Sequence, residues 1–340
     1  MNYVDITSRN WLGGLTLDVV SLGEVMVQLN AVEPGPLRTV RLFERHIAGS
    51  EANTLVGLSR LGFGTRFISR VGDDEMGMAV VSELNSYGVD TSCVKVDSAA
   101  PTGVYFVQRG YPIPGKSKVA YYRSGSAASR MDADDIKPEL LRGARLFHVS
   151  GITPALSASC RAAALGAAIV AHDDGALMSF DTNIRVQLLK TPDIALEVVE
   201  PFLALADIVF TGSGDLDFLF SDEDRDRQVR MALELCPRAR VVVVKCGAKG
   251  ATAYLADGRV LQASAFSVPV VDELGAGDAF DAAFLACVLK GKEVDEALLH
   301  ANAAGAIAVT AKGDLEPLPT WRDIGLFLAA YIGGKETLIR

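Results

Sequence analysis

The segment from Val271 to Leu289, VDELGAGDAFDAAFLACVL, joins a loop of small residues to an apolar helix. Gly275, Ala276 and Gly277 leave room for an anion to approach backbone N–H groups, and the helix would present its positive dipole end to that anion. Asp278 falls in the first turn, where a carboxylate can take a proton from a hydroxyl that attacks a phosphate. An aspartate is also common near helix N-termini for structural reasons, so this segment alone leaves both interpretations open.

Four other segments place polar residues at predicted strand ends or loops. They are residues 46–53 (HIAGSEAN), 120–130 (AYYRSGSAASR), 179–185 (SFDTNIR) and 245–250 (KCGAKG). SFDTNIR follows the carboxyl end of a predicted strand, which is the edge where open α/β sheets bind ligands. A helix cap, a surface strand and an Asx turn account for the same residues without any ligand.

Residues 110–117, GYPIPGKS, match the phosphate-binding pattern G-x-x-x-x-G-K-[ST]. That loop binds phosphate because successive backbone N–H groups converge ahead of a helix. Here Pro112 and Pro114 remove two donors, and the residues that follow alternate as in a strand. We therefore interpret the segment as a hairpin turn and expect no phosphate contact from Lys116.

The bulk composition narrows the class of protein. With 340 residues, 49% of them apolar, the chain can bury one large α/β domain with an appendage, or two small domains. A net charge of −9 argues against an extended nucleic-acid or membrane surface as partner. Five scattered cysteines without a C-x-x-C pair favour a reducing cytoplasm. No apolar run is long enough to span a membrane, and the four histidines lack metal-ligand spacing.

Strands and helices alternate along most of the chain, which predicts a mostly parallel sheet covered on both faces. Residues 102–123 interrupt this alternation with two half-exposed strands, and residues 1–17 are expected to be a short extension without a signal peptide. The expected strands are 18–29, 65–72, 144–150, 176–181, 206–210 and 240–245, with a short β pair across Asp257 and Gly258; the expected helices are 51–62, 73–88, 155–171, and those starting at 193, after 214 and from 276 onward.

Taken in this order, from about Asp18 to Thr320, these segments resemble the ribokinase-like carbohydrate kinase family and, within it, the archaeal-type 2-keto-3-deoxygluconate (2-keto-3-deoxygalactonate) kinases. QRGYPIP and FDTNIR are specific to that subgroup, whereas GAGD marks only the superfamily. The stretches that carry the resemblance are residues 34–38 (PGPLR), 46–53, 102–117, 121–130, 180–185, 275–278 and 313–319 (GDLEPLP).

The resemblance implies a doubly wound α/β fold with a mostly parallel sheet, in one kinase domain over residues 18–340. A small β lid would come from about residues 28–47 and 94–126. The implied activity is ATP-dependent phosphorylation of the terminal hydroxyl of a small sugar acid, most closely 2-keto-3-deoxygluconate to 2-keto-3-deoxy-6-phosphogluconate. ATP, Mg²⁺ and the sugar acid are the implied small-molecule partners, and a homo-oligomer through the lid is implied as well.

The resemblance also assigns roles to individual residues. Asp278 would be the base, and Gly275, Ala276 and Gly277 would form the anion hole. Sugar-acid contacts would come from Gly49, Asn53, Tyr105, Tyr121, Arg123, Arg185 and Asp314. Nucleotide contacts would come from Asn183, Arg185, Ser213, Lys245, Gly247, Gly250, Gly275 and Gly277. Asp215 would help to hold magnesium through water. Small residues after Arg123 leave room for a ligand beside its guanidinium. We therefore expect Arg123 or Arg185 to pair with the substrate carboxylate. Without an acidic substrate, we expect Arg123 to be left unpaired.

The sequence departs from the family pattern in places. Glu273-Leu274 precedes the glycine loop where the family has a threonine, which leaves the use of a monovalent cation open. The epimer of the sugar acid is open too. Related kinases for 5-dehydro-2-deoxygluconate, fructose or ribose remain alternatives. So does a non-catalytic sugar or nucleotide sensor on the same fold, although a sensor would need the glycines and not Asp278.

Overall fold

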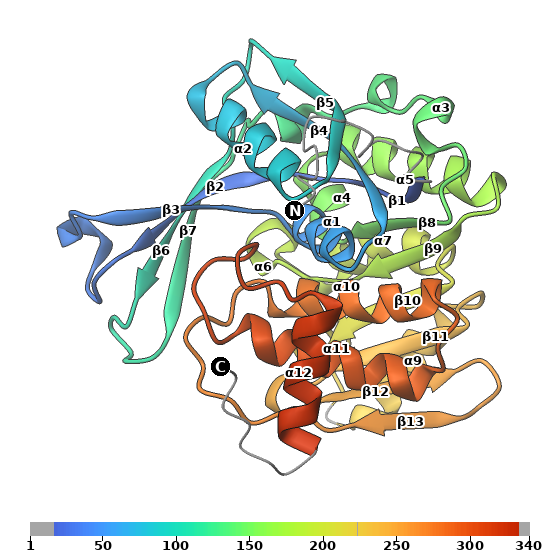
Figure 1. Cartoon of the computed structure of the whole chain (residues 1–340). Coiled ribbons are helices and arrows are strands. Elements are labelled where there is room, and N and C mark those ends of the chain that lie inside the picture. Colours follow the sequence, from blue (N-terminus) through green and yellow to red (C-terminus); the bar gives the residue numbers. More distant parts are fainter. Residues whose placement is uncertain (1–16, 223, 333–340) are drawn as a thin grey trace, which may run out of the picture.

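The computed structural model describes residues 17–222 and 224–332. Figure 1 shows a large sheet with helices packed on both faces and a smaller sheet that projects from one side. The large sheet has the strand order β13-β12-β11-β10-β9-β8-β1-β4-β5. It is parallel from β5 to β11, and β12 and β13 add an antiparallel edge. The predicted doubly wound, mostly parallel α/β architecture is confirmed.

The strands of the large sheet are β1 (Leu17–Leu22), β4 (Gly64–Gly72), β5 (Asp90–Asp97), β8 (Leu146–Ser150), β9 (Leu177–Asp181), β10 (Ile208–Gly212), β11 (Val241–Lys245), β12 (Ala251–Leu255) and β13 (Val260–Ala263). The helices are α1 (Ser50–Arg60), α2 (Glu75–Ser86), α3 (Pro138–Leu141), α4 (Ile152–Leu156), α5 (Ala158–Asp173), α6 (Val186–Leu189), α7 (Pro192–Leu203), α8 (Ser213–Leu219), α9 (Arg225–Glu234), α10 (Ala276–Leu289), α11 (Val294–Ala308) and α12 (Trp321–Ile332). Short 3₁₀ turns cover Leu37–Thr39, Ala128–Arg130, Ala133–Asp135 and Gly247–Lys249.

Side chains of the central strands alternate between two hydrophobic cores, one on each face of the large sheet. Val19 of β1 and Val243 of β11 join the core built with α1, α10 and α11, while Val20 and Val242 join the core built with α5 and α7. Because successive side chains point to opposite faces, a strand buried on both faces needs apolar residues at every position. This explains why these strands are nearly continuous apolar runs in the sequence.

The small sheet has the order β3-β2-β6-β7. Its strands are β2 (Met26–Ala31), β3 (Phe43–Ala48), β6 (Val104–Arg109) and β7 (Ser117–Tyr122). The β6–β7 pair is antiparallel, with Arg109 opposite Ser117, so residues 110–117 form the predicted hairpin connection and not a phosphate-binding loop. In the expected lid range 94–126, residues 94–97 instead belong to β5 of the large sheet.

Two expected elements are wrong in their boundaries. The single strand expected over residues 18–29 divides into β1 and β2, which belong to different sheets. A Cβ at Gly23, between them, would lie 2.4 Å from a carboxylate oxygen of Glu51. The helix expected over 155–171 is interrupted at Ser157, which separates α4 from α5. The Ser157 hydroxyl accepts the N–H of Cys160 at 3.0 Å and caps α5.

Residues 1–16 of the expected N-terminal extension lie outside the described residues, and Leu17 already begins β1. In the described part of the chain, none of the helices has the length and apolar character needed to cross a membrane.

Candidate active site

Helix α10 begins with a left-handed residue at the predicted glycine loop. Gly275 is the N-cap, with φ of +73°, a conformation that glycine adopts without steric cost. A Cβ at this position would also come within 3.2 Å of Asp314. The first backbone N–H groups of α10 therefore remain free to face an anion beside Asp278.

Asp278 is buried in the first turn of α10 and accepts two hydrogen bonds from α1. The Ser50 hydroxyl donates to its Oδ1 at 2.8 Å, and the Asn53 amide donates to its Oδ2 at 2.7 Å. The Asn183 amide in turn donates to the Ser50 hydroxyl at 2.8 Å. Burial raises the pKa of Asp278, and these two hydrogen bonds oppose the rise only in part. An elevated pKa suits a carboxylate that must take a proton.

A second buried carboxylate, Asp314, lies on the small-sheet side of Asp278. The Asn53 amide also reaches Asp314 Oδ2 at 3.2 Å, and the Gln28 amide donates to Asp314 Oδ1 at 2.9 Å and to the Tyr105 hydroxyl at 2.6 Å. Burial, followed by the charge of Asp278, raises the pKa of Asp314 to about 7. Neutral amides and hydroxyls hold both carboxylates, and burial raises the pKa of each above its usual value.

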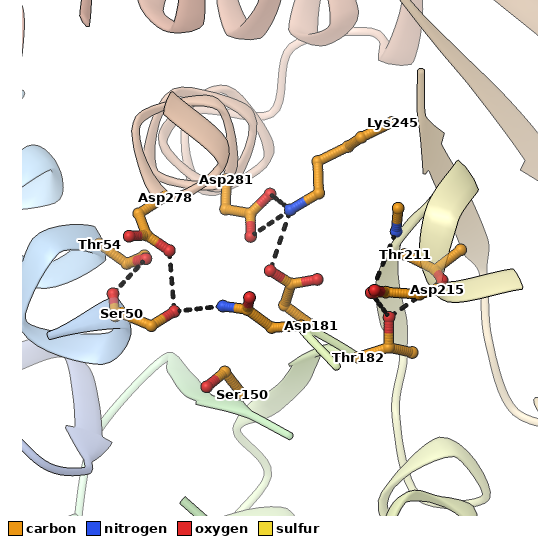
Figure 2. A network of polar contacts seen from close by, with 12 residues as sticks. Ser50, Thr54, Ser150, Asp181, Thr182, Thr211, Asp215, Lys245, Asp278 and Asp281 are labelled. Carbon is orange, nitrogen blue, oxygen red and sulfur yellow. Dashed lines mark hydrogen bonds and ion pairs between the residues drawn. The ribbon is translucent and has the colours of Figure 1, made fainter. Parts of the chain in front are cut away.

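Next to Asp278 along α10, a lysine joins two buried carboxylates. Lys245 Nζ lies 2.9 Å from Asp181 and 3.0 Å from Asp281, and Figure 2 shows it reaching between them. Burial alone would lower the pKa of Lys245, but the two carboxylates raise it above the usual value. The ammonium is therefore a fixed positive charge. A Cβ built on Gly277 would lie 3.5 Å from Nζ, so this charge is next to the glycine loop.

Asp215 and Asp181 supply oxygen donors to the same region. The Thr182 hydroxyl donates to Asp215 Oδ2 at 2.6 Å, as Figure 2 shows. Within residues 17–222 and 224–332, Asp181 Oδ1 is buried without a hydrogen-bond partner. Mg²⁺ takes one or two carboxylates together with water and phosphate oxygens, so this donor set fits a water-bridged magnesium ion.

Three cavities meet at the N-terminus of α10. The largest, of about 570 Å³, extends from Lys245 and Gly277 over Gly247 and Gly250, and its far end has apolar and small residues of the 265–270 segment and α11. The second lies under the small sheet, and the third, of about 260 Å³, contains Asp215. Asp278 lines both the second and the third cavity, so it stands between them.

The family model described as pfkB family carbohydrate kinase matches residues 16–321. The chain belongs to this family. A 2-dehydro-3-deoxygluconokinase from Thermoproteus tenax is 41% identical over 317 residues, which are 92% of this chain and 95% of that protein. Fructokinase-1 from Zea mays is 33% identical over 314 residues, which are 90% of this chain and 96% of that protein. A structure of a putative Ribokinase II from E. coli in complex with ATP and Mg²⁺ superposes with a TM-score of 0.84 at 28% identity, covering 92% of this chain and 98% of that chain.

The cavities of this carbohydrate kinase sort the predicted residues into groups. The cavity under the small sheet contains every predicted sugar-acid contact, together with Asp278 and Gly275: Gly49, Asn53, Tyr105, Tyr121, Arg123, Arg185 and Asp314. The 570 Å³ cavity contains Ala276, Gly277, Lys245, Gly247 and Gly250. The third cavity contains Asn183, Arg185, Asp215, Lys245, Gly275 and Gly277.

Ser213 is the predicted nucleotide contact that these cavities do not include. Its neighbour Gly212 lines the third cavity, whereas the Ser213 carbonyl accepts from Arg225 at 2.8 Å. Asn183 lines the third cavity rather than the 570 Å³ cavity. Its positive φ of +38° turns the chain at the carboxyl end of β9. Asn183 thus lies beside Ser50, in the cavity that also contains Asp278 and Asp215.

The expectation that Arg123 is unpaired without a substrate acid is wrong. Its guanidinium forms an ion pair with Glu24, whose side chain is fully buried, and the Ser126 hydroxyl also donates to Glu24. Burial raises the pKa of Glu24, and Arg123 opposes that rise. Among the described residues, Arg185 has no carboxylate partner, although it lines the same cavity. The sequence cannot show this difference, because Glu24 is about a hundred residues from Arg123.

Several site residues of this kinase were given no role from the sequence: Glu24, Gln28, Ser50, Asp181 and Asp281. Ser50 and Asp181 lie in two of the polar segments considered, residues 46–53 and 179–185. Asp281 follows Asp278 by three residues on α10, a spacing that places both on one helix face. That spacing could have identified Asp281 from the sequence. Gln28 was expected at the start of the lid, and it lies in β2 of the small sheet, but the sequence does not show that its side chain reaches Asp314.

Proposed function

We propose that this kinase transfers the γ-phosphoryl group of ATP to the terminal hydroxyl of 2-dehydro-3-deoxygluconate, also called 2-keto-3-deoxygluconate. The observation that carries the proposal is the position of Asp278, buried between a polar cavity with two guanidinium groups and the glycine loop of α10. The 41% identity to the Thermoproteus tenax 2-dehydro-3-deoxygluconokinase supports the choice of acid.

In the proposed reaction, Asp278 takes the proton of the attacking hydroxyl. Its pKa is raised by burial, and Ser50 and Asn53 hold its orientation. The backbone N–H groups of Gly275–Gly277 and the dipole of α10 stabilise the charge that grows on the transferred group. Lys245 adds a fixed positive charge next to this loop. Positioning and charge stabilisation are the main contributions of a protein to phosphoryl transfer.

ATP is proposed to occupy the 570 Å³ cavity, with its phosphates toward Lys245 and Gly277. The apolar and small residues at the far end suit an adenine ring, and the volume falls in the range of small-molecule sites. Asp181 and Asp215 would hold Mg²⁺ through water, and the ion would neutralise phosphate charge when bound. The E. coli structure in complex with ATP and Mg²⁺ supports the use of both groups.

The substrate carboxylate is proposed to bind Arg185, with Arg123 beside it. Arg185 is the more effective partner because Glu24 already neutralises Arg123. A guanidinium pairs with a carboxylate in a bidentate geometry, and a site that sheds water makes that pair worth about 1.5–3 kcal/mol. A neutral sugar would leave Arg185 without this partner. We also propose that the small sheet acts as the lid that excludes water from the reaction.

An ATP-consumption assay with a panel of sugars tests this function. The panel is 2-dehydro-3-deoxygluconate, its galactonate epimer, fructose and ribose, each with and without Mg²⁺. We expect kcat/KM for at least one sugar acid to exceed that for fructose about tenfold or more, which corresponds to the loss of one charge-assisted pair. A fructose value equal to or above that of both acids would replace the proposal with fructokinase activity, to which the Zea mays relative points.

The outer face of the small sheet is proposed to pair with a second copy of the chain. Tyr105 and Tyr121 face the sugar cavity, and the neighbouring Phe106 and Tyr122 contact each other with ring centroids 5.5 Å apart. Tyr122 is 69% exposed, which is unusual for a cluster of aromatic residues unless a partner covers it. Light scattering should give a dimer or larger assembly, and Tyr122→Glu should reduce it. A monomeric wild-type protein would contradict this part of the proposal.

A further inference from the structure

A buried polar network crosses the small sheet and ends at the loop before α10. Arg109, the last residue of β6, donates from Nη2 to the Asp272 carboxylate and from Nη1 to the Val271 carbonyl at 3.4 Å. Its Nε donates to Asn30 Oδ1 at 2.7 Å, and the Asn30 amide reaches Gln28 Oε1 at 3.4 Å. The guanidinium thus bridges strand β2 and the loop that leads to the glycines.

Both ends of this network reach the site. At one end, Gln28 donates to Asp314 in the sugar cavity at 2.9 Å. At the other end, Asp272 Oδ1 accepts the N–H of Leu274 at 3.2 Å, and the next residue is Gly275. The Asp272 side chain is 0% exposed. Its charge is therefore removed from water and depends on Arg109 for compensation.

Arg109 is not among the described residues that line the sugar cavity, the nucleotide cavity or the space between them. It can act on the reaction only through its neighbours. We propose that Arg109 is a positioning residue for phosphoryl transfer. By holding Asp272 it fixes the loop that presents Gly275–Gly277, and through Asn30 and Gln28 it links the position of that loop to Asp314.

A positioning role for Arg109 predicts a specific effect on the kinetic constants. A shift of this loop weakens the contacts of its backbone N–H groups to the transferred group, whereas the other walls of both substrate cavities stay in place. A misplacement of about 1 Å reduces catalysis about a hundredfold. The effect should therefore fall on kcat and leave KM for ATP and for the sugar nearly unchanged.

The inference rests on the proposed phosphoryl transfer, and a double-mutant cycle of Arg109→Gln and Asp272→Asn tests it. We expect each single variant to lower kcat about ten- to a hundredfold, with both KM values within about threefold of wild type. The double variant should regain part of the loss, because no unpaired charge then remains buried. Arg109→Lys, which keeps the charge but cannot reach all the acceptors, should fall between wild type and Arg109→Gln.

Lys116→Gln is the matched control. Lys116 lies on the same hairpin and faces Glu273 of the same loop at 3.6 Å, but both side chains are exposed, at 65% and 70%. The kcat of Lys116→Gln should stay within about twofold of wild type. If a single variant does not fold, the double variant and Arg109→Lys provide the comparison.

Three results would overturn the positioning role: an unchanged kcat in folded Arg109→Gln, losses that simply multiply in the double variant, or a rise in KM with kcat intact. The cycle uses whichever sugar the wild-type protein phosphorylates. A failure of the sugar-acid assignment would therefore appear in the substrate panel and would leave this cycle interpretable.

Discussion

The two sides of the α10 N-terminus hold buried carboxylates in opposite ways. On the side of the proposed sugar cavity (the sugar side), Asp278 and Asp314 are held by Asn53, Gln28 and Ser50, all of them neutral. On the side of the proposed ATP cavity (the nucleotide side), Asp181 and Asp281 share the ammonium of Lys245. Figure 2 shows Asp278 with Ser50 beside the ion pairs of Lys245, with Asp278 and Asp281 on the same helix.

The difference separates proton chemistry from fixed charge. Burial among neutral donors raises the pKa of a carboxylate and prepares it to accept a proton. Burial also raises the pKa of Asp281, but its partner Lys245, whose own pKa is raised by the two carboxylates, stays protonated and keeps a positive charge in place. The sugar side is therefore suited to take the substrate proton, and the nucleotide side is suited to keep phosphate charge in place. Variants on the two sides should fail in different ways.

Asp278→Asn should have the largest effect on turnover. The amide keeps the size and the possible contacts to Ser50 and Asn53 but cannot take a proton. We expect kcat to fall on the order of 10²–10⁴-fold while the affinities for ATP and sugar change little. Single-turnover rates and equilibrium binding measure the two quantities separately. A variant with more than about a tenth of wild-type kcat would show that Asp278 is not the base.

Lys245→Met should mainly reduce stability. It leaves Asp181 and Asp281 buried without their cation, which costs about 3–5 kcal/mol in the free energy of unfolding. Denaturant unfolding measures the change. Arg259→Ala is the control, because Arg259 pairs with Asp257 at an exposed turn and its removal should change stability by about 0.5 kcal/mol or less. Equal effects of the two substitutions would mean that the nucleotide-side charges are not a buried, mutually dependent set.

Arg185→Met should change the choice of substrate. We expect a loss of about ten- to a hundredfold in kcat/KM for the sugar acid and a smaller loss for fructose. Arg185 is a cleaner test than Arg123, whose removal would also leave Glu24 unpaired. Arg185→Lys should recover part of the loss. Equal losses on acid and neutral sugar would assign Arg185 to the shape of the site and not to recognition of the carboxylate.

Lys116→Ala should have the smallest effect. The lysine lies on the β6–β7 connection and contacts only an exposed glutamate among the described residues, so KM for ATP should stay within about twofold of wild type. A large rise in KM for ATP, with sugar binding and folding intact, would support the phosphate-binding-loop interpretation of residues 110–117.

The sequence was informative where function depends on a local pattern. The glycine loop before Asp278 and the prolines of the β6–β7 connection each act within a few residues, and both predictions agree with the geometry. It was uninformative where charges from distant segments meet. The partners Glu24 of Arg123 and Asp272 of Arg109 depend on how the two sheets are placed. The division of residues 18–29 between two sheets was missed because an apolar run has the same period in both strands.

The pH dependence of kcat/KM, in wild type and in Asp314→Asn, tests most directly whether the sugar side carries the proton chemistry. Burial raises the pKa of Asp278, and the pKa of its neighbour Asp314 is raised to about 7, so wild-type activity should fall as the pH drops through the range near neutrality. Removing the Asp314 charge makes ionisation of Asp278 easier. The acid limb should therefore move to lower pH in Asp314→Asn, whatever the loss in absolute rate, and Lys116→Ala should keep the wild-type limb. An acid limb that stays in place or moves to higher pH in Asp314→Asn would contradict the account.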